Sequence, residues 1–177
     1  GKLLAQEPYI ETTSRYVGHD GSYESMNLPE KVASFFQILA STRRTNQRED
    51  EDATVLFPKM YRHQAKAFRS YLAEGKDIIV ATGTGSGKTE CFLVPMLGSI
   101  YQEARERPES FKKPSVRALI LYPMNALVND QLSRLRNLFG DPAVVGAFHD
   151  CHPQGRHPHF GMYTGRTPYP GPRETAK

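Results

Sequence analysis

The sequence predicts an α/β fold in which helices cover a parallel sheet. Two short apolar runs, residues 77–81 (DIIVA) and 116–122 (VRALILY), have the length and composition of buried strands. Each run is followed by a segment whose apolar side chains have helical spacing, residues 88–103 and 125–139. Strand, helix, strand and helix in this order predict a parallel sheet with right-handed crossover connections.

Residues 1–54 predict an extension in front of this domain. Residues 1–27 mix turn-forming and aromatic residues without a sustained period, so we expect an irregular arm. Residues 28–40 predict a helix with an apolar stripe. Residues 41–53 are polar and charged, which is typical of a solvated or disordered loop.

Residues 55–177 form the predicted domain and contain further elements. Residues 61–72 predict a helix with one apolar face. The helix that follows the first strand contains Pro95, which should kink it or mark a turn of local disorder. Residues 142–150 favour a helix over a short strand, and residues 160–163 resemble a third strand.

The segment between the first strand and its helix, Ala81 to Glu90 (ATGTGSGKTE), predicts a phosphate-binding loop. Glycines at alternate positions allow successive backbone N–H groups to turn toward one anion. The following helix presents its unpaired N–H groups to the same place. The residues expected to bind a nucleoside triphosphate here are Thr82, Gly83, Thr84, Gly85, Ser86, Gly87, Lys88, Thr89 and Glu90.

Lys88 and Thr89 are the expected catalytic residues of this loop. Lys88 supplies a positive charge for the phosphates, and the Thr89 hydroxyl is placed to coordinate Mg²⁺. Thr82 departs from the generic pattern GxxxxGK[ST], which has glycine at its position. A glycine-rich turn that binds nothing is the alternative, and the flanking strand and helix favour the nucleotide.

Gln64 stands near the start of the helix predicted before the loop. A carboxamide offers one donor and one acceptor side by side, which is the pair needed to hold an adenine edge. A glutamine on a helix surface is ordinary by itself. Its place in front of the phosphate loop makes it a candidate for reading the base of ATP.

Composition narrows the class of protein. The net charge of +4 is compatible with a polyanionic partner but decides nothing alone. No apolar run approaches the roughly twenty residues of a membrane span, so we expect a cytoplasmic protein without a membrane partner. The two cysteines, Cys91 and Cys151, predict reduced thiols rather than a disulfide framework.

Two groups of metal-binding residue types are not expected to hold a metal. Asp50 and Glu51 lie in a charged stretch that no apolar strand precedes. The group CHPQGRHPH at residues 151–159 does not repeat the paired spacing of zinc ligands. Loop histidines are therefore the favoured interpretation.

Four ordered motifs resemble those of superfamily 2 helicases. They are Gln64, TGTGSGKT at residues 82–89, PMNALVNDQ at residues 123–131 and TGR at residues 164–166, which match motifs Q, I, Ia and Ib. The resemblance covers residues 55–177 and implies the first RecA-like domain of a P-loop NTPase. More narrowly, TGTGSGKTECFLVP and LYPMNALVNDQL are similar to large bacterial helicases related to the DISARM phage-defence helicase DrmA and to mitomycin-repair helicases.

The resemblance also implies contacts with the sugar–phosphate backbone of a polynucleotide, for which DNA is expected. Met124 stands where relatives often have threonine, and Arg166 replaces an acidic residue, which would strengthen a phosphate contact. We therefore expect salt-dependent binding with little sequence specificity. The residues carried over are Pro123, Asn125, Gln131, Thr164, Gly165 and Arg166.

As an activity, the resemblance implies an ATP- and Mg²⁺-dependent helicase of which this chain is the nucleotide-binding half. The sequence stops before the acidic DExx motif and the second RecA-like domain, so we expect negligible hydrolysis by this segment alone. The expected partners are the rest of the same helicase chain and subunits of a defence complex. An ATP-responsive scaffold without motor activity is the alternative, and a small-molecule kinase would have no use for Gln64 and PMNALVNDQ.

Overall fold

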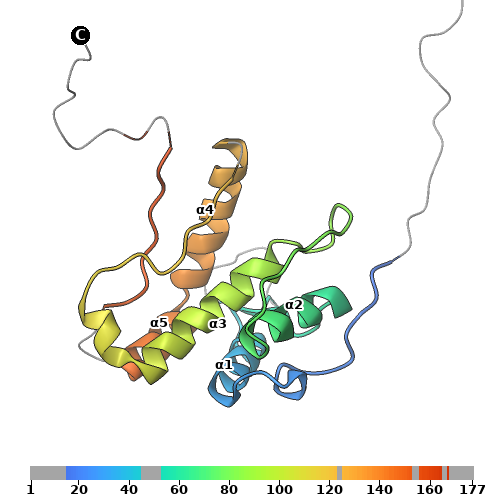
Figure 1. Cartoon of the computed structure of the whole chain (residues 1–177), viewed down its shortest axis with the longest axis horizontal. Helices are drawn as coiled ribbons and strands as arrows, with labels where there is room; N and C mark the ends of the chain where they lie inside the picture. The colour runs from blue at the N-terminus through green and yellow to red at the C-terminus, as the bar shows by residue number, and fades with distance from the viewer. Residues whose placement is uncertain (1–14, 45–52, 123–124, 153–155, 165–166, 168–177) are drawn as a thin grey trace, which may run out of the picture.

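The computed structural model describes residues 15–44, 53–122, 125–152, 156–164 and 167. Figure 1 shows an assembly of helices joined by long connections. The elements, in chain order, are η1 (Glu24–Met26), α1 (Glu30–Ser41), α2 (Arg62–Leu72), α3 (Glu90–Glu106), η2 (Pro108–Lys112), α4 (Asn125–Phe139) and α5 (Pro142–Cys151). No helix in the described part is long and apolar enough to span a bilayer.

Helix α3 is the centre of the core, because it packs against α1, α2 and α5. The apolar stripe predicted on α1 is buried, with Val32 and Phe36 at 0% exposure. Both side chains approach α3 at Gly98, where a Cβ atom would lie 2.7 Å from the Phe36 ring and 3.0 Å from Val32. The absence of a side chain at Gly98 therefore lets α1 and α3 cross closely.

The described part of the N-terminal arm is tied to the start of α2. The backbone N–H of His19 donates to the carbonyl of Met60 at 2.8 Å, and that of Arg62 donates to Val17 at 2.9 Å. Farther along, the ring of Tyr23 is buried between Phe36 and Phe68. This burial raises the pKa of the Tyr23 hydroxyl. The extension therefore contributes side chains to the same core as the predicted domain.

The helices confirm the sequence pattern, whereas the predicted sheet is not confirmed. The described residues contain no paired strand, only isolated antiparallel bridges that join Gly18 to Tyr61 and Arg43 to Thr54. Residues 77–81, 116–122 and 160–163 lie outside any helix or strand.

The segments predicted as strands have no strand paired with them among the described residues, which explains why no sheet is seen. A parallel strand is stabilised by neighbours that pair with its backbone and by cover on both faces. Here Ile79 is 98% exposed and Leu121 is 80% exposed. Both segments thus have the composition of buried strands, and among the described residues no strand pairs with either of them.

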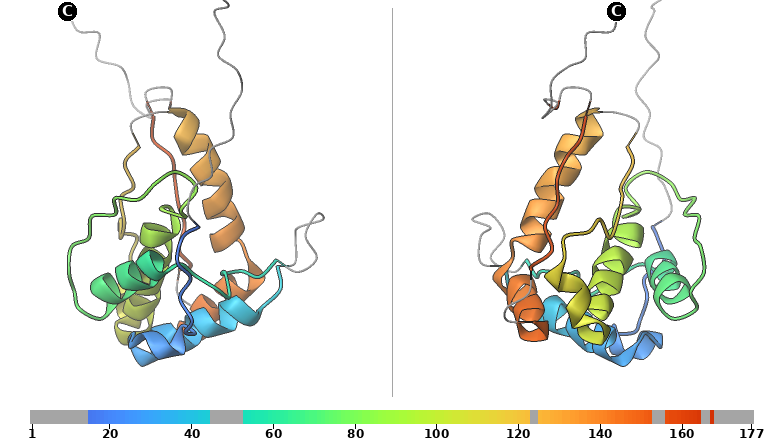
Figure 2. Two further views of the ribbon diagram at one scale, coloured as in Figure 1. Left: turned by 90° about the vertical axis from the view of Figure 1, so that its right-hand side faces the viewer. Right: turned by 60° about the vertical axis from the view of Figure 1, so that its left-hand side comes forward.

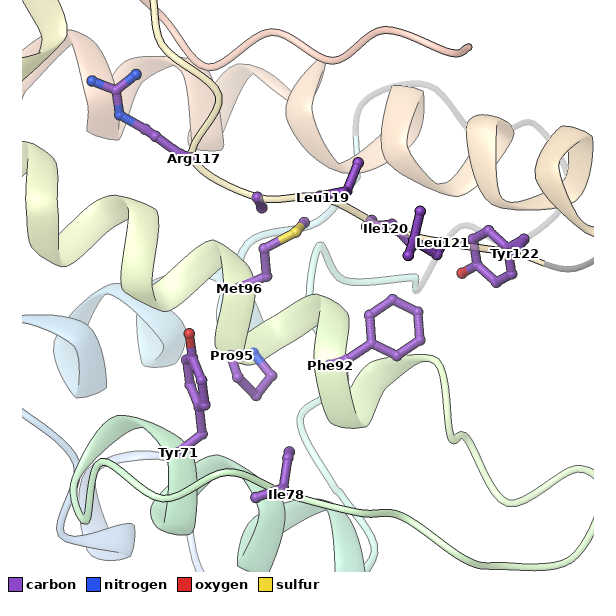
Figure 3. A pocket seen from close by; sticks show the side chains of 11 residues that line it. Tyr71, Ile78, Phe92, Pro95, Met96, Arg117, Leu119, Ile120, Leu121 and Tyr122 are labelled. Carbon is purple, nitrogen blue, oxygen red and sulfur yellow. The ribbon is translucent and has the colours of Figure 1, made fainter. Parts of the chain in front are cut away.

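An apolar groove of about 490 Å³ lies between these two segments on the surface of α3. Figure 3 shows Phe92, Pro95 and Met96 of α3 between Ile78 on one side and residues 117–122 on the other. Pro95 is buried there, and α3 continues past it to Glu106. The groove separates the two segments that the sequence predicts to share a sheet.

Candidate nucleotide-binding site

The predicted phosphate loop is a compact turn directly in front of α3. Gly85 and Gly87 have φ angles of 74° and 71°, a conformation that residues with a Cβ atom rarely adopt. Ser86 between them is 1% exposed, and its hydroxyl shares a 2.6 Å hydrogen bond with the hydroxyl of Thr82. Thr82, which departs from the generic motif, therefore closes the loop through its side chain.

Lys88 is exposed and folds back over the loop. Its ammonium donates to the carbonyl oxygens of Thr82 at 2.9 Å and Gly83 at 2.6 Å. These bonds place the positive charge at the mouth of the turn. They involve neutral oxygens, so a phosphate oxygen would be a stronger acceptor for the same ammonium.

The N-terminus of α2 fastens the loop from the other side. Gln64 is 6% exposed, and its Oε1 accepts from the backbone N–H of Tyr61 at 2.8 Å. Its Nε2 donates to the carbonyl of Gly87 at 3.1 Å, and a ring nitrogen of His63 lies 2.8 Å from the carbonyl of Ser86. Both polar atoms of the Gln64 side chain thus already have protein partners.

Two residues outside the loop contact it in ways that the sequence does not indicate. The hydroxyl of Tyr16 donates to the carbonyl of Thr84 at 3.4 Å, and its ring contacts those of Tyr61 and His63 with centroids 5.5 and 5.6 Å away. The buried thiol of Cys91 donates to the carbonyl of Gly87 at 3.6 Å. Tyr16 and Thr84 are separated by 68 positions, so no local pattern could indicate their contact.

Thr89 and Glu90 begin α3 on the far side of Lys88. Thr89 occupies the N-cap position with helical backbone angles, and its side chain makes no cap hydrogen bond. The Glu90 carboxylate is 2.9 Å from the guanidinium of Arg134 on α4. Together, the glycine turn, the ammonium and the helix start fit a phosphate chain, because they supply backbone N–H groups and positive charge at one place.

The residues predicted to contact nucleic acid are only partly covered by the structure. Pro123, Gly165 and Arg166 lie outside the described residues, and of Asn125 only the backbone position at the start of α4 is described. Gln131 is 9% exposed, and its Nε2 donates to the Asp130 carboxylate at 3.1 Å.

Thr164 lies in a tight turn. The backbone N–H of Thr164 donates to the Thr167 hydroxyl at 2.8 Å. In return, the backbone N–H of Thr167 donates to the carbonyl of Thr164 at 2.9 Å. The segment before this turn, residues 156–163, begins at η2, where the Arg156 N–H donates to the Phe111 carbonyl, and reaches α4 where Phe160 contacts Phe139 with ring centroids 6.3 Å apart. It then runs along α4 toward that helix's N-terminus (Figure 2), so the described end of this segment and the start of α4 lie at the same end of the molecule.

The cysteine and histidine residues near the end of α5 form a separate small cluster. The rings of His149 and His157 are stacked with centroids 6.2 Å apart, and the Cys151 thiol donates to the carbonyl of Ala147. In the part of the chain that the structure describes, no group of three or more histidine, cysteine or acidic residues could hold a metal ion.

Comparison with known proteins gives one family and several relatives. The family model described as DEAD/DEAH box helicase matches residues 61–156. The chain is 43% identical to the Druantia protein DruE of Escherichia coli (strain UMEA 4076-1), over 99% of this chain and 9% of DruE. It is 34% identical to the uncharacterized ATP-dependent helicase YprA of Bacillus subtilis (strain 168), over 65% of this chain and 15% of YprA.

A third relative is the uncharacterized ATP-dependent helicase MJ1574 of Methanocaldococcus jannaschii, which is 31% identical over 60% of this chain and 14% of that protein. The chain therefore spans between 9% and 15% of the length of these three relatives. No solved structure matches the chain significantly.

Proposed function

Because the chain belongs to the DEAD/DEAH box helicase family of superfamily 2, we propose that it is the nucleotide-binding part of an ATP-dependent helicase or translocase that acts on DNA. The observation that carries this proposal is the loop before α3. It combines two glycines at positive φ, an ammonium at its mouth and a helix start behind it.

ATP would be held mainly through its phosphates. Lys88 would exchange its bonds with the Thr82 and Gly83 carbonyls for charge-assisted bonds with phosphate oxygens. The backbone N–H groups of residues 83–90 would supply the remaining donors, with Ser86 and Thr82 keeping the turn closed. The Thr89 hydroxyl would hold Mg²⁺, which neutralises charge on the phosphates.

For the base, we propose that Gln64 acts through an exchange of partners. Its carboxamide holds the Tyr61 N–H and the Gly87 carbonyl in this structure. Each amide group has a second N–H and a second lone-pair site. Adenine would therefore be read either by these remaining positions, which keeps base and phosphate loop linked through one side chain, or after Gln64 has released the Gly87 carbonyl.

For the polynucleotide, we propose backbone contacts from the segments of motifs Ia and Ib. The start of α4 offers backbone N–H groups for a phosphate, and the turn at Thr164 leads into Gly165 and Arg166. The other residues in this proposal are Pro123, Asn125 and Gln131. Such contacts predict strong dependence on salt and little dependence on base sequence.

We propose a role in bacterial anti-phage defence, in the cytoplasm and together with defence-complex subunits. The support is the 43% identity to the Druantia protein DruE, in an alignment that covers 99% of this chain. The motifs of this chain also resemble those of DISARM helicases. The motor activity would belong to the whole protein, including the rest of the helicase chain. We propose that the 177 residues alone are inactive.

The test is Lys88→Ala in the full-length protein, with Lys66→Ala as the control because Lys66 is an exposed lysine on α2. We expect Lys88→Ala to abolish DNA-stimulated ATP hydrolysis and unwinding and Lys66→Ala to retain both. DNA-stimulated hydrolysis by Lys88→Ala would refute the assignment. If the wild-type protein binds ATP and DNA without ever turning ATP over, the alternative holds, and the chain belongs to an ATP-responsive scaffold.

A further inference from the structure

Arg134 on α4 lies between two carboxylates. Its Nη1 is 2.9 Å from Glu90 Oε1, and its Nε is 3.6 Å from Asp130 Oδ2. Glu90 is the first residue of α3 and follows Lys88 and Thr89 directly, whereas Asp130 precedes Arg134 by about one helical turn. The guanidinium thus joins the helix behind the phosphate loop to the helix that begins in motif Ia.

This ion pair joins two helices that share α5 as a packing partner but differ in their other contacts. Helix α3 packs against α1, α2 and α5, while α4 packs against α5 and extends away from the core (Figures 1 and 2). Arg134 and Glu90 are separated by 44 positions in the chain. A side-chain link of this kind lets a movement at the start of α3 reach α4 without rearranging the core.

Glu90 is well placed to respond to the loop. Its side chain is 15% exposed and that of Arg134 is 47% exposed, so the carboxylate end of the pair is shielded from solvent while the guanidinium is partly open to it. A Cβ atom added at Gly87 would lie 3.1 Å from Glu90 Oε2, which shows that the carboxylate lies against the last glycine of the turn. Displacement of the Gly87 backbone would therefore displace the partner of Arg134.

Arg134 is poorly suited to act as a phosphate contact itself. Two carboxylates and one guanidinium leave this group with a net negative charge, which repels a polynucleotide. An arginine is well suited to bridge two carboxylates, because different N–H groups of its rigid guanidinium can bond to each of them at once. A lysine ammonium has no such fixed directions.

We propose that Arg134 is a positioning residue that couples the state of the phosphate loop to the grip of α4 on DNA. The inference rests on the proposed function. When ATP draws Lys88 away from the Thr82 and Gly83 carbonyls, the loop relaxes around Gly87 and Glu90 moves with it. Arg134 follows Glu90 and turns the start of α4, so that ATP and DNA alter each other's affinity by the same factor.

The experiment measures this factor in the full-length protein. The dissociation constant of a fluorescent oligo(dT) strand is determined with and without a non-hydrolysable ATP analogue, and that of the analogue with and without the strand. Both ratios must agree in the wild type. The variants are Arg134→Gln, Arg134→Lys and the control Arg136→Gln, which removes the same charge from an exposed position of the same helix.

We expect Arg134→Gln to lower the coupling factor by about threefold or more, with Arg134→Lys intermediate and Arg136→Gln unchanged. The affinity for the analogue without DNA should stay at the wild-type value in Arg134→Gln, and the slope of DNA affinity against salt should stay the same. Circular dichroism and thermal unfolding confirm that each variant is folded.

Three outcomes would overturn the inference. An unchanged coupling factor in Arg134→Gln shows that the ion pair transmits nothing. A loss of DNA affinity that is equal with and without the analogue, with a shallower salt slope, shows that Arg134 binds phosphate directly. Equal effects of Arg134→Gln and Arg136→Gln show that only the charge of α4 matters. Failure of the proposed function is recognised separately, because the wild type would then not bind the analogue or the strand.

Discussion

The carboxamide of Gln64 donates to the carbonyl of Gly87 at 3.1 Å and thereby ties the first turn of α2 to the last residue of the glycine turn. The same carboxamide accepts from the Tyr61 N–H. One buried side chain therefore caps the start of α2 and also holds the phosphate loop. Gln64 is therefore part of the scaffold of the site as well as a candidate to contact the base.

This relationship predicts a stability effect for Gln64→Ala. The substitution leaves the Tyr61 N–H and the Gly87 carbonyl without their partner, which should lower the free energy of unfolding by about 1–3 kcal/mol. Affinity for ATP should fall as well, because the loop is no longer held. Urea unfolding and an ATP titration measure the two effects in the same protein.

The control for this prediction is Gln102→Ala, which removes a glutamine whose carboxamide bonds to Glu106 on the surface of α3. Its stability should change by no more than about 0.5 kcal/mol. If Gln64→Ala unfolds like the wild type and only loses its preference for ATP over GTP, Gln64 reads the base and does not support the loop.

The helices and the loop could be predicted because their signals are local. The stripe on α1 and the repeat on α4 follow from the spacing of apolar residues, and the turn at Gly85 and Gly87 follows from the need for positive φ. The pairing of the predicted strands into a sheet could not be predicted in the same way, because a strand depends on partners from distant parts of a chain. Ile79, with 98% exposure, has strand composition and no partner strand among the described residues.

The details of the site were predictable in part. Residue types identified the loop, yet the roles of individual side chains depend on contacts between distant segments. Thr82 departs from the generic motif, yet its hydroxyl bonds to that of Ser86 inside the loop. Tyr16 reaches the loop from a segment outside the family match. The positions of Gly165 and Arg166 lie outside the described residues, so their role stays a prediction.

Alanine substitutions at three glycines are expected to change the free energy of unfolding by different amounts. Gly146→Ala, inside α5 with open space around its Cβ position, should stabilise the protein by about 0.5–1 kcal/mol. Gly85→Ala meets no neighbour but has a φ of 74°, so it should cost about 1–2 kcal/mol. Gly87→Ala adds a collision with Gln64 Nε2 to the same backbone strain and should cost more.

Thermal unfolding of the three variants and titration with ATP check this order. ATP affinity should be unchanged in Gly146→Ala and weakest in Gly87→Ala. Equal stability of the Gly85 and Gly87 variants would show that the contact between Gly87 and Gln64 does not constrain the loop in solution.

The last prediction concerns the thiols and pH. Burial raises the pKa of Cys91 to about 11 and also raises the pKa of Cys151. Cys91 is completely buried and Cys151 is partly exposed. In the native protein at neutral pH, a disulfide reagent should therefore label Cys151 first and Cys91 only after unfolding. A Cys151→Ala variant assigns the fast phase, and rapid labelling of that variant would contradict the burial of Cys91.

The raised pKa also fixes the direction of the pH dependence. The unfolded thiol ionises near pH 9, whereas the folded Cys91 thiol keeps its proton until about pH 11. Because the unfolded chain then binds fewer protons than the native one, the contribution of Cys91 to stability is complete below pH 9 and is lost as the pH rises toward 11. Urea unfolding of the wild type and Cys91→Ala across this interval measures the effect. The wild type should lose stability more steeply than the variant, and parallel curves would show that the thiol ionises alike in both states.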